Sequence, residues 1–123
     1  MLNNVMVVDD EPQVLFSVKK ILTAAGLNVL TVDSGKVCLE ELKKGFQGLI
    51  LMDIMMPDLD GWDTIQNIID SGFAKGNIIC MLTGKEKPGS RMKELKEYIL
   101  DYITKPFDPN DLVDLVKQYL TYL

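Results

Sequence analysis

The sequence contains no histidine and only two cysteines, Cys38 and Cys80. The lack of histidine excludes histidine-based zinc sites and histidine-containing triads, so any chemistry must use carboxylates, hydroxyls, amines or thiols. The two cysteines lack the spacing of a metal site, and we expect both to be buried and reduced. The net charge of -5 argues against a surface that binds nucleic-acid phosphates directly.

The sequence also lacks long apolar runs, internal repeats and linkers rich in glycine, serine or proline. No apolar run approaches the roughly 18 residues that a membrane span needs. An apolar segment begins directly after residues 1–4 and leaves no room for a signal peptide, so we expect a cytoplasmic protein without a membrane partner. The 123 residues, 47% of them apolar, are typical of one domain, which we expect to span residues 1–123.

Short apolar runs alternate with segments that are long enough for helices. The runs cover residues 5–8, 28–32, 49–52, 78–82 and 102–103. This alternation predicts an α/β protein with a doubly wound parallel sheet of five strands and five helices. Three of the runs are almost entirely apolar, as in strands that helices cover on both faces, whereas residues 28–32 are more mixed and suit a sheet edge.

Capping residues mark the first two helices. Pro12 and Gly26 bracket an apolar stripe with helical spacing, which predicts a first helix between them. Ser34 can cap a second helix, and Gly45 can end it.

The last two helices differ in their apolar content. Residues 108–109, Asp-Pro, open a final helix with a continuous apolar face. A fourth helix, over about residues 88–98, is polar around a thin apolar set of Met92 and Leu95. We therefore expect it to pack loosely and to be able to move.

Polar side chains gather where the predicted strands end. In a doubly wound sheet, ligands bind in the crevice outside the carboxyl ends of the strands. The residues at these ends supply acids, a hydroxyl and an amine: Asp9, Asp10, Asp53, Thr83 and Lys105. Each alone would be an ordinary loop or surface residue, and only their joint placement indicates a functional site.

This set of residues suits phosphoryl transfer. Three carboxylates brought together repel one another, and a hard divalent cation such as Mg²⁺ relieves the repulsion while leaving positions for water and phosphate oxygens. Asp53 ends the central strand and is the best-placed nucleophile. Lys105 and Thr83 can each bind a phosphoryl oxygen.

The residues and their spacing resemble the response-regulator receiver family of two-component signalling, of the chemotaxis type. The resemblance covers the whole chain and rests on VVDDE at residues 7–11, LMDIMMPDLDG at residues 51–61, Thr83, and KPF at residues 105–107. It implies a flavodoxin-like sheet with strand order 2-1-3-4-5. It also implies a phosphoacceptor domain and not a conventional enzyme, which takes a phosphoryl group on Asp53 from a sensor histidine kinase or phosphotransfer protein and regulates a protein target or output domain.

The resemblance assigns a role to each ligand of the metal. It implies that Asp10 and Asp53 bind Mg²⁺ through their side chains and that Asp9 helps through water. The backbone carbonyl of Met55 is implied to be a further ligand. The resemblance also implies a cis Lys105–Pro106 peptide bond, which X-Pro bonds tolerate.

Thr83 and Tyr102 are implied to form a coupled switch. Phosphorylation adds about -1.5 to -2 charges, which would draw the Thr83 hydroxyl inward and let the Tyr102 ring turn toward the core. The surface of the fourth helix, fifth strand and fifth helix would then change shape through a population shift. A dimer that forms on phosphorylation is one outcome of such a change. Gly61 is expected to supply the unusual backbone of the loop after the acceptor.

Three positions, Met55, Gly84 and Lys85, set this sequence apart from the commonest family pattern. Met55 could shield an acyl phosphate from water, and Lys85 could hold or misplace that water. Gly84 could loosen the loop after the fourth strand. These influences oppose one another, so the sequence leaves the lifetime of the phosphate open.

Other functions fit parts of the sequence. A magnesium phosphohydrolase with a carboxylate nucleophile would need a second acid two residues after Asp53, where Met55 stands. A flavodoxin-like flavin carrier would need a Ser/Thr/Gly-rich phosphate loop, but residues 9–12 are Asp-Asp-Glu-Pro. A receiver that serves as a constitutive interaction module usually lacks an acid, the acceptor or the lysine, and all of these are present here.

Overall fold

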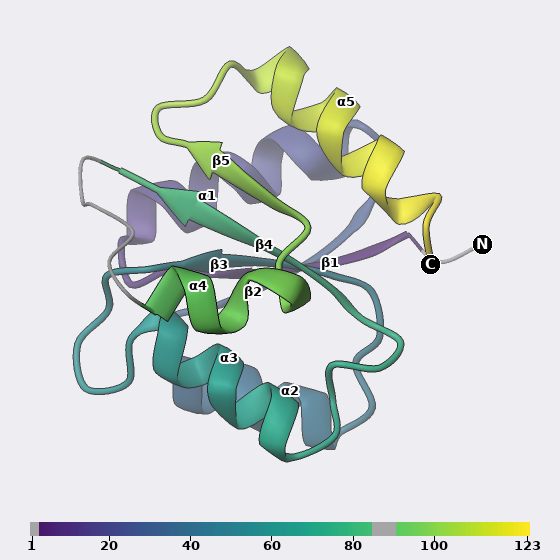
Figure 1. The fold of residues 1–123 in the computed structure, drawn as a ribbon. Helices are drawn as coiled ribbons and strands as arrows, with labels where there is room; N and C mark the ends of the chain where they lie inside the picture. The colour runs from purple at the N-terminus through teal and green to yellow at the C-terminus, as the bar shows by residue number, and fades with distance from the viewer. Residues whose placement is uncertain (1–2, 85–90) are drawn as a thin grey trace.

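The computed structural model describes residues 3–84 and 91–123. Five parallel strands form a sheet in the order β2-β1-β3-β4-β5 (Figure 1). The strands are β1 (Asn4–Val8), β2 (Asn28–Val32), β3 (Leu49–Asp53), β4 (Ile78–Thr83) and β5 (Asp101–Thr104). The predicted strand order and flavodoxin-like architecture are therefore confirmed, and β2 lies at an edge of the sheet as its mixed composition indicated.

Helices connect the strands and cover both faces of the sheet. α1 and α5 lie on one face, and α2, α3 and α4 lie on the other (Figure 1). Their bounds are α1 (Pro12–Ala24), α2 (Gly35–Lys43), α3 (Gly61–Asp70), α4 (Arg91–Leu95), which continues into the 3₁₀ helix η1 (Lys96–Tyr98), and α5 (Pro109–Leu120). Within the described part of the chain, no helix has both the length and the apolar character needed to cross a membrane.

The predicted helix-capping residues lie at the helix ends and make the expected contacts. The Ser34 side chain accepts a hydrogen bond of 3.2 Å from a backbone N–H in the first turn of α2. The Asp108 carboxylate accepts two such bonds at the start of α5. Gly26 follows α1 with a φ of 87°, a conformation that glycine adopts without strain.

The predicted fourth helix is helical over all of its described residues, first as α4 and then as η1. Of the expected residues 88–98, the first three lie outside the described residues, and α4 proper covers only the five residues Arg91–Leu95. Leu95 is its one buried side chain, and Met92 is partly buried. Because most of the stability of a short helix comes from the packing of its apolar face, this narrow face adds little to the stability of the segment.

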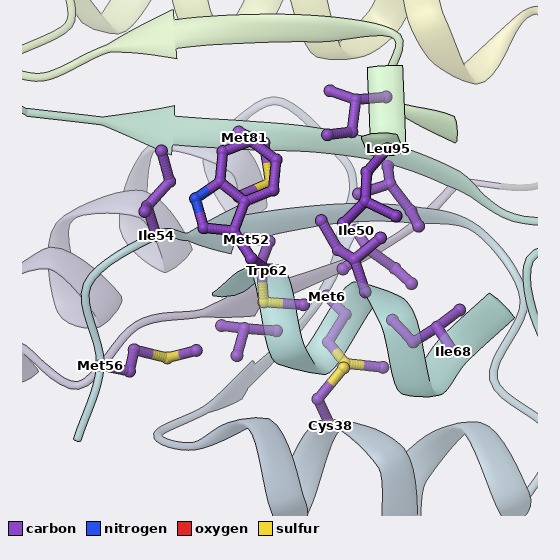
Figure 2. Packing of buried hydrophobic residues seen from close by; sticks show 14 of the residues in the cluster. Met6, Cys38, Ile50, Met52, Ile54, Met56, Trp62, Ile68, Met81 and Leu95 are labelled. Carbon is purple, nitrogen blue, oxygen red and sulfur yellow. The ribbon is translucent and has the colours of Figure 1, made fainter. Parts of the chain in front are cut away.

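Alternate residues of each strand enter two separate hydrophobic layers. In β1, Met6 and Val8 face the layer of α2, α3 and α4, whereas Val5 and Val7 face α1 and α5. Figure 2 shows the first layer, in which side chains of the sheet meet those of α2, α3 and α4. Trp62 of α3 is 5% exposed in this layer and acts as a packing anchor. Burial on both faces explains the continuous apolar character of β1, β3 and β4.

The two cysteines are free thiols, one in each hydrophobic layer. Burial raises the pKa of Cys38 and of Cys80 to about 12. Both thiols are therefore protonated at neutral pH, and thiols in this form are poor nucleophiles. The predicted buried, reduced state of the cysteines is confirmed.

Candidate functional site

Three carboxylates meet at the carboxyl edge of the sheet. Parallel pairing places Val8 of β1 opposite Met52 of β3, so the next residues, Asp9 and Asp53, lie side by side where the strands end. Together with Asp10 they bring carboxylate oxygens within 4.8 Å of one another. Asp9 is 0% exposed and Asp53 is 4% exposed, whereas Asp10 is open to solvent. The cluster is therefore buried on the protein side and accessible at Asp10.

Lys105 supplies positive charge to this cluster. Its Nζ atom lies 2.8 Å from Oδ2 of Asp9 and 3.2 Å from Oδ1 of Asp53. Its backbone N–H donates a hydrogen bond of 2.6 Å to the carbonyl of Thr83, which ties the segment after β5 to the end of β4. The Lys105–Pro106 peptide bond is cis, as the family resemblance implies.

The charged groups shift one another's pKa values. Burial and the negative charge of Asp9 raise the pKa of Asp53, Lys105 offsets only part of this effect, and the net result is a pKa of about 6. Burial acts to lower the pKa of Lys105, but its hydrogen bond to Asp9 and the charges of Asp53 and Asp9 outweigh burial and raise it. Among the described residues, one ammonium faces three carboxylates, so this part of the site is short of positive charge.

The available ligand atoms fit a hard divalent cation. The ligand atoms of the cluster are all carboxylate oxygens, which Mg²⁺ prefers. Oδ1 of Asp9 accepts a hydrogen bond of 2.9 Å from the N–H of Glu11, and its Oδ2 accepts one from Lys105. Both oxygens of Asp9 thus have protein partners, and the exposed Asp10 offers its oxygens more directly. A cation here would relieve the repulsion that raises the pKa of Asp53.

The two expected switch residues lie on neighbouring strands, β4 and β5. The Thr83 hydroxyl makes a long, weak hydrogen bond of 3.5 Å to the carbonyl of Ile103. Tyr102 packs against the layer of α4, and burial raises its pKa. Its hydroxyl is buried and has no hydrogen-bond partner among the described residues. Of the two unusual positions that follow, Gly84 comes directly after β4, and Lys85 lies outside the described residues.

The loop after β3 corrects one expectation. Ile54 is buried, whereas the Met55 side chain is 63% exposed. The left-handed backbone of this loop belongs to Asp58, with a φ of 65°, and not to Gly61. Aspartate tolerates this conformation because its short polar side chain can bond locally. Gly61 instead begins α3 and lies against the backbone of Asp53.

Two contacts between elements were not predicted from the sequence. Arg91 of α4 forms an ion pair with Asp63 of α3, and the hydrogen bond from Arg91 holds the pKa of Asp63 below its usual range. The Tyr119 hydroxyl of α5 donates a hydrogen bond to Asp101 of β5. The partners are 28 and 18 residues apart, and neither pair belongs to a motif or a periodic pattern that sequence reasoning could use.

A family model matches this arrangement. The model described as response regulator receiver domain matches residues 5–117, which include all of the site residues above. The chain belongs to the response regulator receiver domain family. Receiver domains are phosphoacceptor signalling modules that interact with histidine kinases, so the acidic cluster and Lys105 lie in a signalling domain and not in a conventional enzyme.

Curated relatives support the same assignment. This receiver is 32% identical over 116 residues to the transcriptional activator protein IrlR of Burkholderia pseudomallei, a match that covers 94% of this chain and 49% of IrlR. It is 30% identical over 118 residues to an uncharacterized 14.6 kDa protein of Leptolyngbya boryana, covering 94% of this chain and 88% of the relative. The chain spans about half the length of IrlR and of several other curated relatives that it matches.

Solved structures show the same fold. A CheY-like response regulator receiver domain protein from Methanospirillum hungatei is 48% identical with a TM-score of 0.92, and the match covers 97% of this chain and 94% of that chain. The chemotaxis protein CheY4 of Vibrio cholerae is 25% identical with a TM-score of 0.82, covering 96% of this chain and 98% of that chain. The receiver fold therefore extends over nearly the whole chain.

Proposed function

We propose that residues 1–123 form one receiver domain in which Asp53 accepts a phosphoryl group from a sensor histidine kinase or phosphotransfer protein in a Mg²⁺-dependent reaction. The observation that carries this proposal is the cluster of Asp9, Asp10 and Asp53 within 4.8 Å, with Lys105 bonded to two of the three acids. The exposed, apolar Met55 disfavours a phosphohydrolase, because that position would need an acid to protonate the leaving group.

The residues divide the transfer step among them. An oxygen of Asp53 attacks the phosphorus atom, the P–N bond to the donor histidine breaks, and the imidazole nitrogen keeps the bonding electrons and takes a proton. Lys105, which lies 3.2 Å from Asp53, favours the carboxylate form and can then pair with a phosphoryl oxygen. Bound Mg²⁺ supplies positive charge to the phosphoryl oxygens.

Four residues would contribute to metal binding in different ways. Asp10 and Asp53 would hold Mg²⁺ through their side chains, and Met55 through its backbone carbonyl. Asp9 would act through water, since both of its oxygens already accept hydrogen bonds from the protein.

Phosphorylation would be transmitted through Thr83 and Tyr102. The hydrogen bond of Thr83 to Ile103 is long, so a phosphoryl oxygen at Asp53 offers the hydroxyl a better partner. The buried Tyr102 hydroxyl lacks a partner among the described residues, and an unsatisfied buried hydroxyl costs about 1–3 kcal/mol. A movement that gives the Tyr102 hydroxyl a hydrogen-bond partner would remove this cost when Thr83 also moves. It would reshape the surface of α4, β5 and α5 for a protein target, an output domain or a second copy.

Intact-protein mass after incubation with Mg²⁺ and acetyl phosphate tests this proposal. We expect wild type to gain the mass of one phosphoryl group only when metal is present. The gain should disappear in Asp53→Ala and persist in Asp33→Ala, which removes an exposed acid at the end of β2. If wild type gains no mass at any donor concentration, Asp53 loses its assigned role, and the domain is better described as a constitutive interaction module.

A further inference from the structure

The first residue of α3 lies directly against the backbone of Asp53. The Gly61 N–H donates a hydrogen bond of 2.8 Å to the carbonyl of Ile54. A Cβ atom at Gly61 would stand 2.3 Å from the carbonyl oxygen of Asp53 and 2.9 Å from Cα of Ile54. Real Cβ atoms essentially never approach other atoms closer than 3.0 Å, so a side chain at this position would force the backbone to move.

Strand pairing, hydrogen bonds and packing restrict backbone movement on both sides of this contact. Asp53 is the last residue of β3 and pairs with Leu82 of β4. On the α3 side, Thr64 is 0% exposed, and its hydroxyl and N–H both donate to the carbonyl of Asp60, at 2.7 and 2.9 Å. Thr64 also packs against Gly35 of α2, where an added Cβ would lie 2.1 Å from the Thr64 hydroxyl oxygen. The start of α3 is therefore held between the sheet and α2.

We propose that Gly61 is a positioning residue, which sets the Asp53–Ile54 backbone in the place that metal binding and phosphoryl acceptance require. This inference rests on the proposed function of Asp53. The Ile54 carbonyl that Gly61 holds belongs to the peptide bond joining Ile54 to Met55, so a displacement there would move the Asp53 carboxylate and turn the Met55 carbonyl together. A misplacement of about 1 Å can slow a positioned reaction by about 10²-fold.

Gly48 provides a matched control at the other end of the same strand. It directly precedes β3, and a Cβ there would lie 2.2 Å from the backbone carbonyl oxygen of Asn4. Gly61→Ala and Gly48→Ala thus both introduce a clash with backbone, Gly48→Ala also strains a backbone with a φ of 158°, and we expect both to lower stability. We expect only Gly61→Ala to weaken Mg²⁺ binding, measured by calorimetry, by about tenfold or more, and to slow phosphorylation by acetyl phosphate at saturating Mg²⁺ by about 10²-fold. Both variants are compared at a temperature where each remains folded.

Carbonyl chemical shifts of residues 53–55 in the metal-free protein provide a readout that does not depend on phosphorylation. We expect these shifts to change in Gly61→Ala and to stay in place in Gly48→Ala. If wild type takes no phosphoryl group while the shifts move and Mg²⁺ binding weakens, the proposed function fails and the positioning role stands. If Gly61→Ala matches Gly48→Ala in shifts, Mg²⁺ affinity and phosphorylation rate, Gly61 is only a packing residue and the inference is overturned.

Hydrogen exchange in wild type covers the case in which Gly61→Ala does not fold. The hydrogen bond from Gly61 to Ile54 should protect the Gly61 amide as strongly as the amides of β3. Exchange at the rate of an open loop would overturn the inference, because a freely opening contact cannot hold Asp53 in position.

Discussion

The two ends of β3 satisfy their polar groups in different ways. At the amino end, the N–H of Gly48 donates a hydrogen bond of 2.9 Å to the side chain of Asn77, and the Asn77 amide in turn donates one of 2.8 Å to the carbonyl of Phe73. These groups are neutral, and each finds its partner within the chain. At the carboxyl end, Asp53 meets Asp9, and the single ammonium of Lys105 bridges the two acids.

The difference between the two ends indicates where the molecule depends on a ligand. The amino end needs no ligand, because the groups of Gly48, Asn77 and Phe73 form hydrogen bonds with one another. The described residues at the carboxyl end include three clustered carboxylates and one ammonium, so this end would gain stability from a cation, and a phosphoryl group would then become an acceptable partner. Substitutions at the two ends should therefore differ in size and in their dependence on metal.

The largest effect is expected from Lys105→Met. The change leaves the buried carboxylates of Asp9 and Asp53 without their cation, and removing one partner of a buried ion pair costs about 3–5 kcal/mol. Urea denaturation in the presence of a chelator measures the free energy of unfolding. The exposed Lys93 supplies the control, because Lys93→Met should leave stability nearly unchanged. Equal stability of the two variants would show that Lys105 does not balance the carboxylates.

Asp53→Asn should stabilise the metal-free protein at neutral pH. Because folding raises the pKa of Asp53 from 3.8 to about 6, the folded state binds a proton more readily than the unfolded state between these pH values. Wild-type stability therefore falls as pH rises through this window, and the variant escapes that loss. We expect the variant to be more stable by about 2–3 kcal/mol at pH 7 and by much less at pH 4.

Chemical denaturation with a chelator across this pH range measures the effect of Asp53→Asn. Saturating Mg²⁺ should reverse the order of stability, because the binding free energy is added mainly to wild type. A variant that is less stable than wild type at pH 7 without metal would contradict the raised pKa of Asp53.

Asn77→Ala tests the amino end and should have an intermediate effect. It removes the hydrogen bonds to Gly48 and Phe73, which should lower the free energy of unfolding by about 1–2 kcal/mol. Calorimetric titration should show Mg²⁺ affinity equal to that of wild type. A large loss of affinity would mean that the two ends of β3 are coupled, and the comparison between them would fail.

Met55→Ala should have the smallest effect on stability and metal binding. The side chain is 63% exposed, and the proposed ligand is its backbone carbonyl, so we expect stability to change by less than about 0.5 kcal/mol. Mg²⁺ affinity from the same titration should stay close to the wild-type value. A clear loss of affinity would show that the side chain covers the metal, and the decay rate of the phosphorylated protein would then show whether it also excludes water.

Sequence reasoning predicted the sheet well because burial on two faces demands a continuous apolar run. All of β3 is buried, and its short length between turn residues favours a strand over a helix. The fourth helix was harder to place, since Leu95 alone is buried in α4 and such a weak apolar face carries little information on boundaries.

The sequence predicted the site residues that lie at strand ends. It did not predict the contact in which two backbone segments lie against each other. Asp9 and Asp53 were found because parallel strands end at the same edge. The contact between Gly61 and the Asp53 carbonyl involves only backbone, so the sequence shows a glycine but not its reason. Because glycine adopts a left-handed φ without strain, we expected that φ at Gly61, whereas the structure has it at Asp58.

The burial of Cys38 and Cys80 makes the domain convenient for site-directed spectroscopy. Both native thiols are shielded, so a cysteine introduced at an exposed position is the one that a maleimide label can reach in the folded protein. Phe16 on α1 is 70% exposed and Tyr98 in η1 is 39% exposed. Spin labels at Phe16→Cys and Tyr98→Cys would therefore measure, across the sheet, whether the end of the α4 segment moves on incubation with Mg²⁺ and acetyl phosphate, with both native cysteines left in place.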